Sequence, residues 1–325
     1  MSNKNWNLVA DIGGTNARFG LVDFDASSLE EIRRYSVAEF PNFDDALQQF
    51  LSDIGELGVW HSVPKAACLA IACPADSDEV QFTNSPWTIN RNKISSMLDG
   101  AHVEFINDFA AVGYAVAELN PRDWKQIGGK TPIPGKAISI LGPGTGLGVS
   151  TLVPVGTGYH LVEGEGGHVD FAPIDPHECA VLEILTARFG RVSIERLLSG
   201  AGILNLYQAL AQLAGKPPQH ETPAQVTNAA LQGNDSLAER TLHMFCRILG
   251  AHAGNLALTL GAKGGVYVAG GIVPRFIDFF EKSDFRQRFE AKGRFRPYLA
   301  DIPVRVVLKD NLGLFGAARK LNLME

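Results

Sequence analysis

The 325-residue sequence has no surplus of basic residues, no secretion signal that we can identify and no long apolar run. With 29 Lys and Arg against 35 Asp and Glu, its net charge of −6 argues against nucleic-acid and anionic-membrane partners, because no excess cations meet the phosphates. The best candidate for a membrane span, Asn255–Val273, is broken by Lys263 and by several glycines. Because the polar first residues lead straight into a strand pattern, we expect no signal peptide.

Cysteine is also scarce. Cys68, Cys73, Cys179 and Cys246 form no CxxC pair and no zinc-ligand spacing, so we expect reduced, mostly buried thiols in a cytoplasmic protein. Hydrophobic residues make up 46% of the sequence and charged residues 20%, which is ordinary for a globular protein. The length allows two domains or one large one.

Glycine, by contrast, is plentiful in three turns that each follow an apolar strand pattern. The first glycine turn is Asp11–Thr15, the second is Gly142–Gly146 and the third is Ala269–Gly271. Glycine lets backbone N–H groups approach a phosphate without a Cβ in the way. Each turn alone is typical of an ordinary hairpin, whereas all three together, two of them with an adjacent Thr, favour phosphate binding.

Two common nucleotide motifs are missing from these turns. A dinucleotide fingerprint needs a third glycine where Leu147 or Val149 stands, and it opens a helix rather than a strand. A Walker loop would need glycine at the position of Trp124, ahead of Gly129-Lys130-Thr131.

The second glycine turn repeats the theme of the first. Strand, Gly-Thr turn and second strand follow one another in both places, and the second strand of the first copy is predicted over residues 17–24. This weak internal repeat indicates two related lobes, joined by the Gly- and Pro-rich residues 122–135. The part beyond residue 173 is mainly helical, with helices predicted over 176–189, from Ile194 with Ser193 as cap, and over 202–214, 223–231, 236–260 and 312–321.

Asn107 and Asp108 stand where a strand pattern passes into an Ala-rich helix pattern. In open α/β sheets such junctions display ligand-handling side chains beyond the carboxyl ends of the strands. One of the two residues could equally be the N-cap of the helix. Three other polar residues have similar alternatives: Glu195 suits the first turn of a helix, and His168 and Asn84 suit turns.

The motifs together resemble those of bacterial glucokinases, especially the proteobacterial type, within the hexokinase–actin–Hsp70 ATPase superfamily. The resemblance covers nearly the whole chain, and its motifs occur in the family's order: Asp11-Ile-Gly-Gly-Thr-Asn16, Asn107-Asp108, Gly144-Thr-Gly146, Glu165-Gly-Gly-His168 and Ala269-Gly-Gly-Ile272. Members of the related ROK group usually carry a zinc-binding Cys cluster after their Gly-His. Here only Cys179 follows His168 within reach, so we expect no structural zinc.

The resemblance implies a two-lobed α/β protein with the actin-like ATPase (ribonuclease H-like) fold. The small α/β lobe would hold residues 1–117 and 309–325, and the larger α+β lobe residues 118–308, with the active-site cleft between them. Closure of the lobes on the sugar would exclude water. The family further implies a homodimer.

The activity implied is ATP-dependent phosphorylation of D-glucose at O6. Asp108 would be the general base, and Asn107, Glu165, His168 and Glu195 would bind the other hydroxyls. The nucleotide would be held by Ala10, Asp11, Ile12, Gly13, Gly14, Thr15, Gly144, Thr145, Gly146, Gly270 and Gly271. Asp11 would meet the Mg²⁺ of MgATP through water, because magnesium keeps much of its hydration shell.

Two alternatives remain open at this stage. The first is a kinase for another hexose, such as N-acetylglucosamine or mannose. The second is a non-catalytic, nucleotide-gated, actin-like interaction protein, against which the cluster of hydroxyl-binding candidates argues.

Overall fold

The computed structural model describes residues 4–23, 28–61, 63–82 and 85–324, so two positions discussed above, Phe24 and Asn84, lie outside the described residues. The chain forms two compact units: unit 1 comprises Met1–Leu119 and Lys309–Glu325, and unit 2 comprises Asn120–Leu308. Among the described residues, no helix combines the length and the apolar character that a membrane crossing requires.

Unit 1 is built on a five-stranded sheet with the order β3-β2-β1-β4-β7. The first three strands are antiparallel neighbours, while β4 and β7 run parallel to β1. Their bounds are β1 Trp6–Ile12, β2 Asn16–Asp23, β3 Leu29–Ser36, β4 Ala66–Ile71 and β7 His102–Asn107. Successive side chains point to opposite faces of a strand, so Leu8 and Ala10 enter one core and Val9 enters another.

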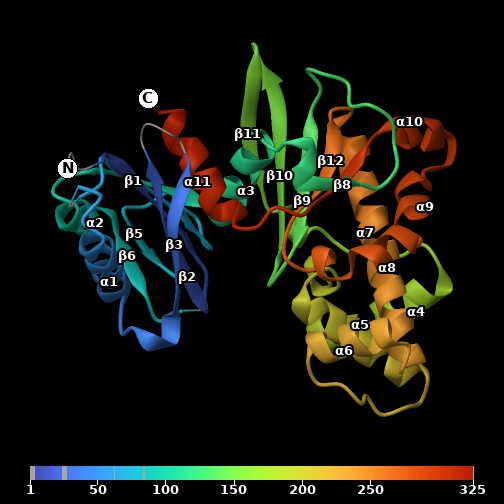
Figure 1. The fold of residues 1–325 in the computed structure, drawn as a ribbon. Coiled ribbons are helices and arrows are strands. Elements are labelled where there is room, and N and C mark those ends of the chain that lie inside the picture. Colours follow the sequence, from blue (N-terminus) through green and yellow to red (C-terminus); the bar gives the residue numbers. More distant parts are fainter. Residues whose placement is uncertain (1–3, 24–27, 62, 83–84, 325) are drawn as a thin grey trace. The chain divides into compact units, whose positions relative to one another are not determined.

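Helices cover both faces of this sheet. On one face lie α1 (Phe43–Glu56) and α2 (Arg91–Met97), and α1 buries Phe43, Leu47 and Phe50 there. On the other face lie α3 (Asp108–Val116) and α11 (Leu312–Asn322), as Figure 1 shows for α1 and α11. A short hairpin of β5 (Glu79–Gln81) and β6 (Thr88–Asn90) completes the unit.

Unit 2 contains a six-stranded sheet with the order β11-β10-β9-β12-β13-β8. The bounds are β8 Trp124–Gln126, β9 Ile138–Pro143, β10 Leu147–Val155, β11 Gly158–Gly164, β12 Gly265–Val268 and β13 Val304–Val307. Again an antiparallel meander, β9 to β11, is followed by parallel strands, β12 and β13. The first five strands in this order, β11 to β13, repeat the arrangement of unit 1, in agreement with the repeat found in the sequence, and β8 adds an antiparallel strand at the edge.

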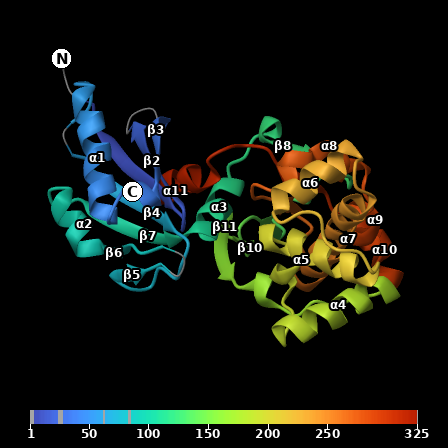
Figure 2. The same ribbon diagram turned by 90° about the horizontal axis from the view of Figure 1, so that it is seen from below.

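The helices of unit 2 gather together beside its sheet (Figure 2) and form one large core. Their bounds are α4 Pro176–Phe189, α5 Gly200–Leu213, α6 Pro223–Gln232, α7 Ser236–Leu260, α8 Ile277–Lys282, α9 Phe285–Glu290 and α10 Arg296–Asp301. The long α7 is capped by Asp235, whose side chain accepts bonds from Leu237 N and Ala238 N, and it ends at the left-handed Gly261.

One predicted helix is shorter than expected. The helix expected to begin at Ile194 is a single 3-10 turn, η4 (Ile194–Arg196), and Ser193 makes no side-chain cap bond. Ser199 instead caps the next helix, α5, by accepting a hydrogen bond from Gly202 N at 3.0 Å. Glu195 is therefore not in the first turn of an α-helix.

Candidate active site

In unit 1 the first glycine turn and the Asn107–Asp108 junction share one edge of the sheet. The register aligns Ile12 with Ile71 and Ile71 with Asn107, so β1, β4 and β7 end level with one another. Neighbouring strands lie about 4.8 Å apart, which places the ends of β1 and β7 on the order of 10 Å from each other. The turn is closed by a hydrogen bond from Gly13 N to Asn16 O, 2.9 Å long.

Asn107 is the N-cap of α3. Its Oδ1 accepts from Phe109 N at 2.9 Å and from Ala110 N at 3.2 Å, so the capping alternative is correct for this residue. Because Oδ1 is occupied by these two bonds, the Nδ2 group is the part of the side chain that remains to bind a ligand, as a donor. Asp108 is the first residue of α3, where the helix dipole favours a carboxylate. Burial, and secondarily the Asp108 charge, raise the pKa of Cys73 to about 11.

Asp11, on β1, faces a basic residue of the neighbouring strand. Its Oδ2 accepts a hydrogen bond from Arg18 Nη1 at 2.9 Å. Burial raises the pKa of the Asp11 carboxyl, and the Arg18 charge and hydrogen bond oppose that rise. A cation arriving at Asp11 would therefore compete with Arg18 for the carboxylate.

In unit 2 the second glycine turn is tied to the segment that carries Glu195. Gly144 N donates to Gly146 O, and Gly144 O accepts from Gly200 N, both at 2.8 Å. Glu195 Oε2 accepts from Leu147 N at 2.8 Å. Gly146 lies so close that a Cβ on it would stand 2.5 Å from the same carboxylate oxygen.

Glu165 and His168 lie at the two ends of a short 3-10 helix, η3 (Gly166–His168), and both side chains are exposed. His168 Nε2 and Glu165 Oε2 are 3.8 Å apart, which leaves both groups available to a hydroxylated ligand. The glycines between them permit close packing, because a Cβ on Gly167 would stand 2.1 Å from Leu147 O.

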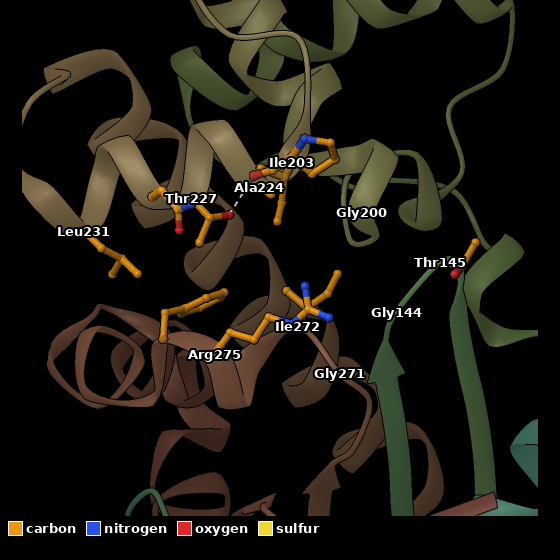
Figure 3. Close-up of a pocket in the computed structure, with 13 residues that line it drawn as sticks. Gly144, Thr145, Gly200, Ile203, Ala224, Thr227, Leu231, Gly271, Ile272 and Arg275 are labelled. Atoms are coloured by element: carbon orange, nitrogen blue, oxygen red, sulfur yellow. Dashed lines mark hydrogen bonds between the residues drawn. The ribbon is translucent and has the colours of Figure 1, made fainter. Parts of the chain in front are cut away.

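A cavity of about 440 Å³ opens beside the second glycine turn, entirely within unit 2. Figure 3 shows Gly144 and Thr145 on one side, Ala224, Thr227 and Leu231 of α6 on another, and Gly271, Ile272 and Arg275 on a third. Gly271, which the sequence predicts to bind nucleotide, is one of the residues that line this cavity. Gly270 is not among the lining residues. It adopts a left-handed φ of 97° against Pro143 O.

The walls that α6 and Arg275 contribute were not predicted from the sequence. The capping box of Thr222 and Gln225 marks where α6 begins, but it does not show which face lines a cavity. Ile203 and Gly200 of α5 also line the cavity, and no local pattern distinguishes them from ordinary helix residues.

Comparisons with known proteins converge on one family. The family model described as Glucokinase matches residues 8–324. The glucokinase of Hahella chejuensis is 47% identical over 325 residues, which cover 100% of this chain and 99% of that protein. The crystal structure of a glucokinase from an Antarctic psychrotroph has a TM-score of 0.86 and 35% identity, covering 98% of this chain and 99% of that one. A ROK family glucokinase from Streptomyces griseus, in complex with glucose and AMPPNP, shares the fold with a TM-score of 0.64, 19% identity and coverage of 97% and 98%.

Proposed function

Since the chain belongs to the glucokinase family, we propose that Asp108 is the general base of its reaction, the transfer of the ATP γ-phosphoryl group to O6 of glucose. The family match and the similar structures establish glucokinase activity and the mixed α/β two-sheet fold. The same comparisons confirm the resemblance noted in the sequence. The position of Asp108 carries the base assignment: it begins α3 at the edge where β1, β4 and β7 end. We assign the fold to the actin-like ATPase class, supported by the five-strand arrangement that the two sheets share.

In this reaction Asp108 accepts the proton of the sugar 6-hydroxyl while the O6–phosphorus bond forms. The bond between the γ-phosphorus and the bridging oxygen breaks, and ADP leaves. A carboxylate at the N-terminus of α3 is favoured in its ionised form by the helix dipole, which suits a base. Phosphoryl transfer needs mainly positioning and charge stabilisation from the protein.

Two glycine turns are assigned to the phosphates and the third to adenosine. Backbone N–H groups of Gly13, Gly14 and Gly144–Gly146, with the hydroxyls of Thr15 and Thr145, would bind phosphate oxygens, while Ala10 and Ile12 support the first turn from β1. Gly270 and Gly271 would flank adenosine, supported by the large cavity that Gly144, Thr145 and Gly271 share. Its volume of about 440 Å³ is within the range of small-molecule sites.

Asp11 is the carboxylate we assign to the Mg²⁺ of MgATP, through water. No three His, Cys, Asp or Glu side chains come together as a metal cage in the described part of the chain. A single carboxylate fits Mg²⁺ nonetheless, because this ion takes most of its ligands from water and from substrate phosphates. When bound, the ion would neutralise negative charge on the phosphates.

The residues we assign to the sugar are Glu165, His168, Glu195 and, through its Nδ2 group, Asn107. These groups supply both acceptors and donors, as a sugar with several hydroxyls requires. A hexose lacking a matching hydroxyl would leave one of them unpaired, which can reduce kcat/KM by about 10⁴-fold. From the family alone we also propose a cytoplasmic location and a homodimer. The sedimentation mass of the purified protein would test the homodimer.

A coupled assay of ADP release tests the function with glucose, mannose, fructose and N-acetylglucosamine. We expect the largest kcat/KM with glucose. A larger value with N-acetylglucosamine or mannose would assign the enzyme to that sugar instead. ATP binding without turnover on any hexose would favour the nucleotide-gated interaction protein.

The base assignment is tested with Asp108→Asn, which should lower kcat by about 10²–10⁴-fold while leaving the calorimetric Kd for glucose within a few-fold. Asp99→Asn is the matched control, because Asp99 is exposed and precedes β7, whereas Asp108 follows it. Its left-handed φ of 56° is one that Asn also tolerates. A near-normal kcat for Asp108→Asn would show that another group accepts the proton.

A further inference from the structure

Leu147, the residue directly after the second glycine turn, is held by both segments of unit 2 that we assign to the sugar. Its N–H donates to Glu195 Oε2 at 2.8 Å. Its C=O is approached so closely by Gly167 that a Cβ there would stand 2.1 Å away. Gly167 lies between Glu165 and His168, so all three sugar candidates of unit 2 belong to segments packed on Leu147.

The turn itself is clamped by the segment 195–200. At one end Gly200 N donates to Gly144 O at 2.8 Å, and at the other Glu195 binds Leu147. The clamp is braced internally, because Ser199 Oγ donates to Glu195 O at 2.9 Å while it caps α5. A movement of Glu195 would therefore shift the second glycine turn, which lines the nucleotide cavity.

Glu195 has a second oxygen to offer. Its Oε2 accepts a hydrogen bond from Leu147 N, whereas Oε1 has no hydrogen-bond or ion-pair partner among the described residues. The side chain is half-buried, so it is accessible from one side. A hydroxyl bound at Oε1 and the backbone N–H at Oε2 would fix the same carboxylate from two directions.

We propose that Glu195 is a positioning residue that couples the two substrates: it binds a sugar hydroxyl with one oxygen and anchors the nucleotide-binding turn with the other. This inference rests on the proposed function. Binding of sugar restrains the carboxylate and with it the turn, so the nucleotide meets a turn that is already ordered. Linkage makes the effect reciprocal, and couplings of this kind are typically about 5–150-fold; for one shared side chain we expect about 5–20-fold.

The test is a binding cycle by calorimetry with MgAMPPNP and glucose, each titrated in the absence and in the presence of the other. The wild-type protein should bind each ligand about 5–20-fold more tightly when the other is present. In Glu195→Ala, binding of MgAMPPNP alone should weaken, binding of glucose alone should weaken, and the ratio that measures coupling should fall to about one.

Two further variants separate the roles of the two oxygens. Glu195→Gln keeps an oxygen that can accept from Leu147 N, so MgAMPPNP alone should bind within about three-fold of wild type while glucose binds less tightly. Gly146→Ala retains the Glu195 side chain, but its Cβ would stand 2.5 Å from Oε2, so the carboxylate must shift away from Leu147 N and the coupling should be lost from the nucleotide side. Glu183→Gln, a change of an exposed glutamate on α4, is the control for removal of a carboxylate from unit 2.

Three results would overturn the inference. The first is a coupling ratio of one in the wild-type protein. The second is a Glu195→Ala variant that loses only glucose affinity, which would make Glu195 a sugar ligand alone. The third is a Gly146→Ala variant that binds nucleotide poorly yet retains the full coupling. Failure of the wild-type protein to bind either ligand would instead reject the proposed function.

Discussion

The first and second glycine turns follow equivalent strands in the two units, but they are supported differently. The first is closed by its own hairpin, through Gly13 N and Asn16 O, and by a bond from Val37 N to Thr15 O. The second also has a bond of its own, from Gly144 N to Gly146 O, but its additional support comes from Glu195 and Gly200, in the segment that carries a proposed sugar ligand. Under the proposed function both turns bind the nucleotide, and only the second is hydrogen-bonded to a residue that we assign to the sugar, Glu195.

The largest difference between the two units is expected in the stability lost when a glycine is replaced by alanine. Gly167→Ala sets a Cβ against the Leu147 backbone oxygen, and overpacking of this kind costs on the order of 3 kcal/mol of unfolding free energy. Gly13→Ala meets nothing closer than 3.6 Å, so the unfolding free energy should change by less than about 1 kcal/mol. Urea unfolding of both variants gives the comparison, and equal losses would contradict the difference in support.

The ion pair between Asp11 and Arg18 in unit 1 gives a smaller, pH-dependent effect on stability. Arg18→Gln leaves the Asp11 carboxylate without its cation and should cost about 1–2 kcal/mol at neutral pH. The pKa of Asp11, already raised by burial, rises further, so the loss should disappear as the pH falls through that pKa and the carboxyl takes up a proton. Arg33→Gln, which removes a partly exposed pair with Glu31, is the control and should show little effect. A loss that stays constant down to acid pH would argue against the pairing.

The smallest effect is expected at the α6 wall of the cavity in unit 2 that we propose binds the nucleotide. Thr222→Ala removes the cap of α6 and should cost about 0.5–1 kcal/mol of stability, with a few-fold rise in the Kd for MgAMPPNP. Thr222→Ser retains a capping hydroxyl and should behave like the wild-type protein. An unchanged nucleotide Kd in the alanine variant would show that the wall does not depend on this cap.

Local patterns predicted the elements that have strong signals of their own. The bounds 176–189 and 236–260 agree with α4 and α7, because a capping aspartate precedes each helix (Asp175 and Asp235) and a glycine ends each (Gly190 and Gly261). The edge strand β11 was not predicted, since its residues are exposed apart from Leu161 and its strand structure comes from pairing with β10. The bond between Glu195 and Leu147 joins residues 48 apart in the sequence, so it follows from the tertiary fold rather than from any local pattern.

The helix α11 has a consequence for the synthesis of the protein. Its Leu314, Ala317 and Leu321 fill a core with Val9 and Ile106, although residues 120–308 separate α11 from the rest of unit 1. At about 5–20 residues per second, a ribosome needs about 10–40 s to translate that interval. During this time only α3 can cover that face of the nascent sheet, so we expect chaperone binding to the emerging chain to persist until α11 leaves the exit tunnel.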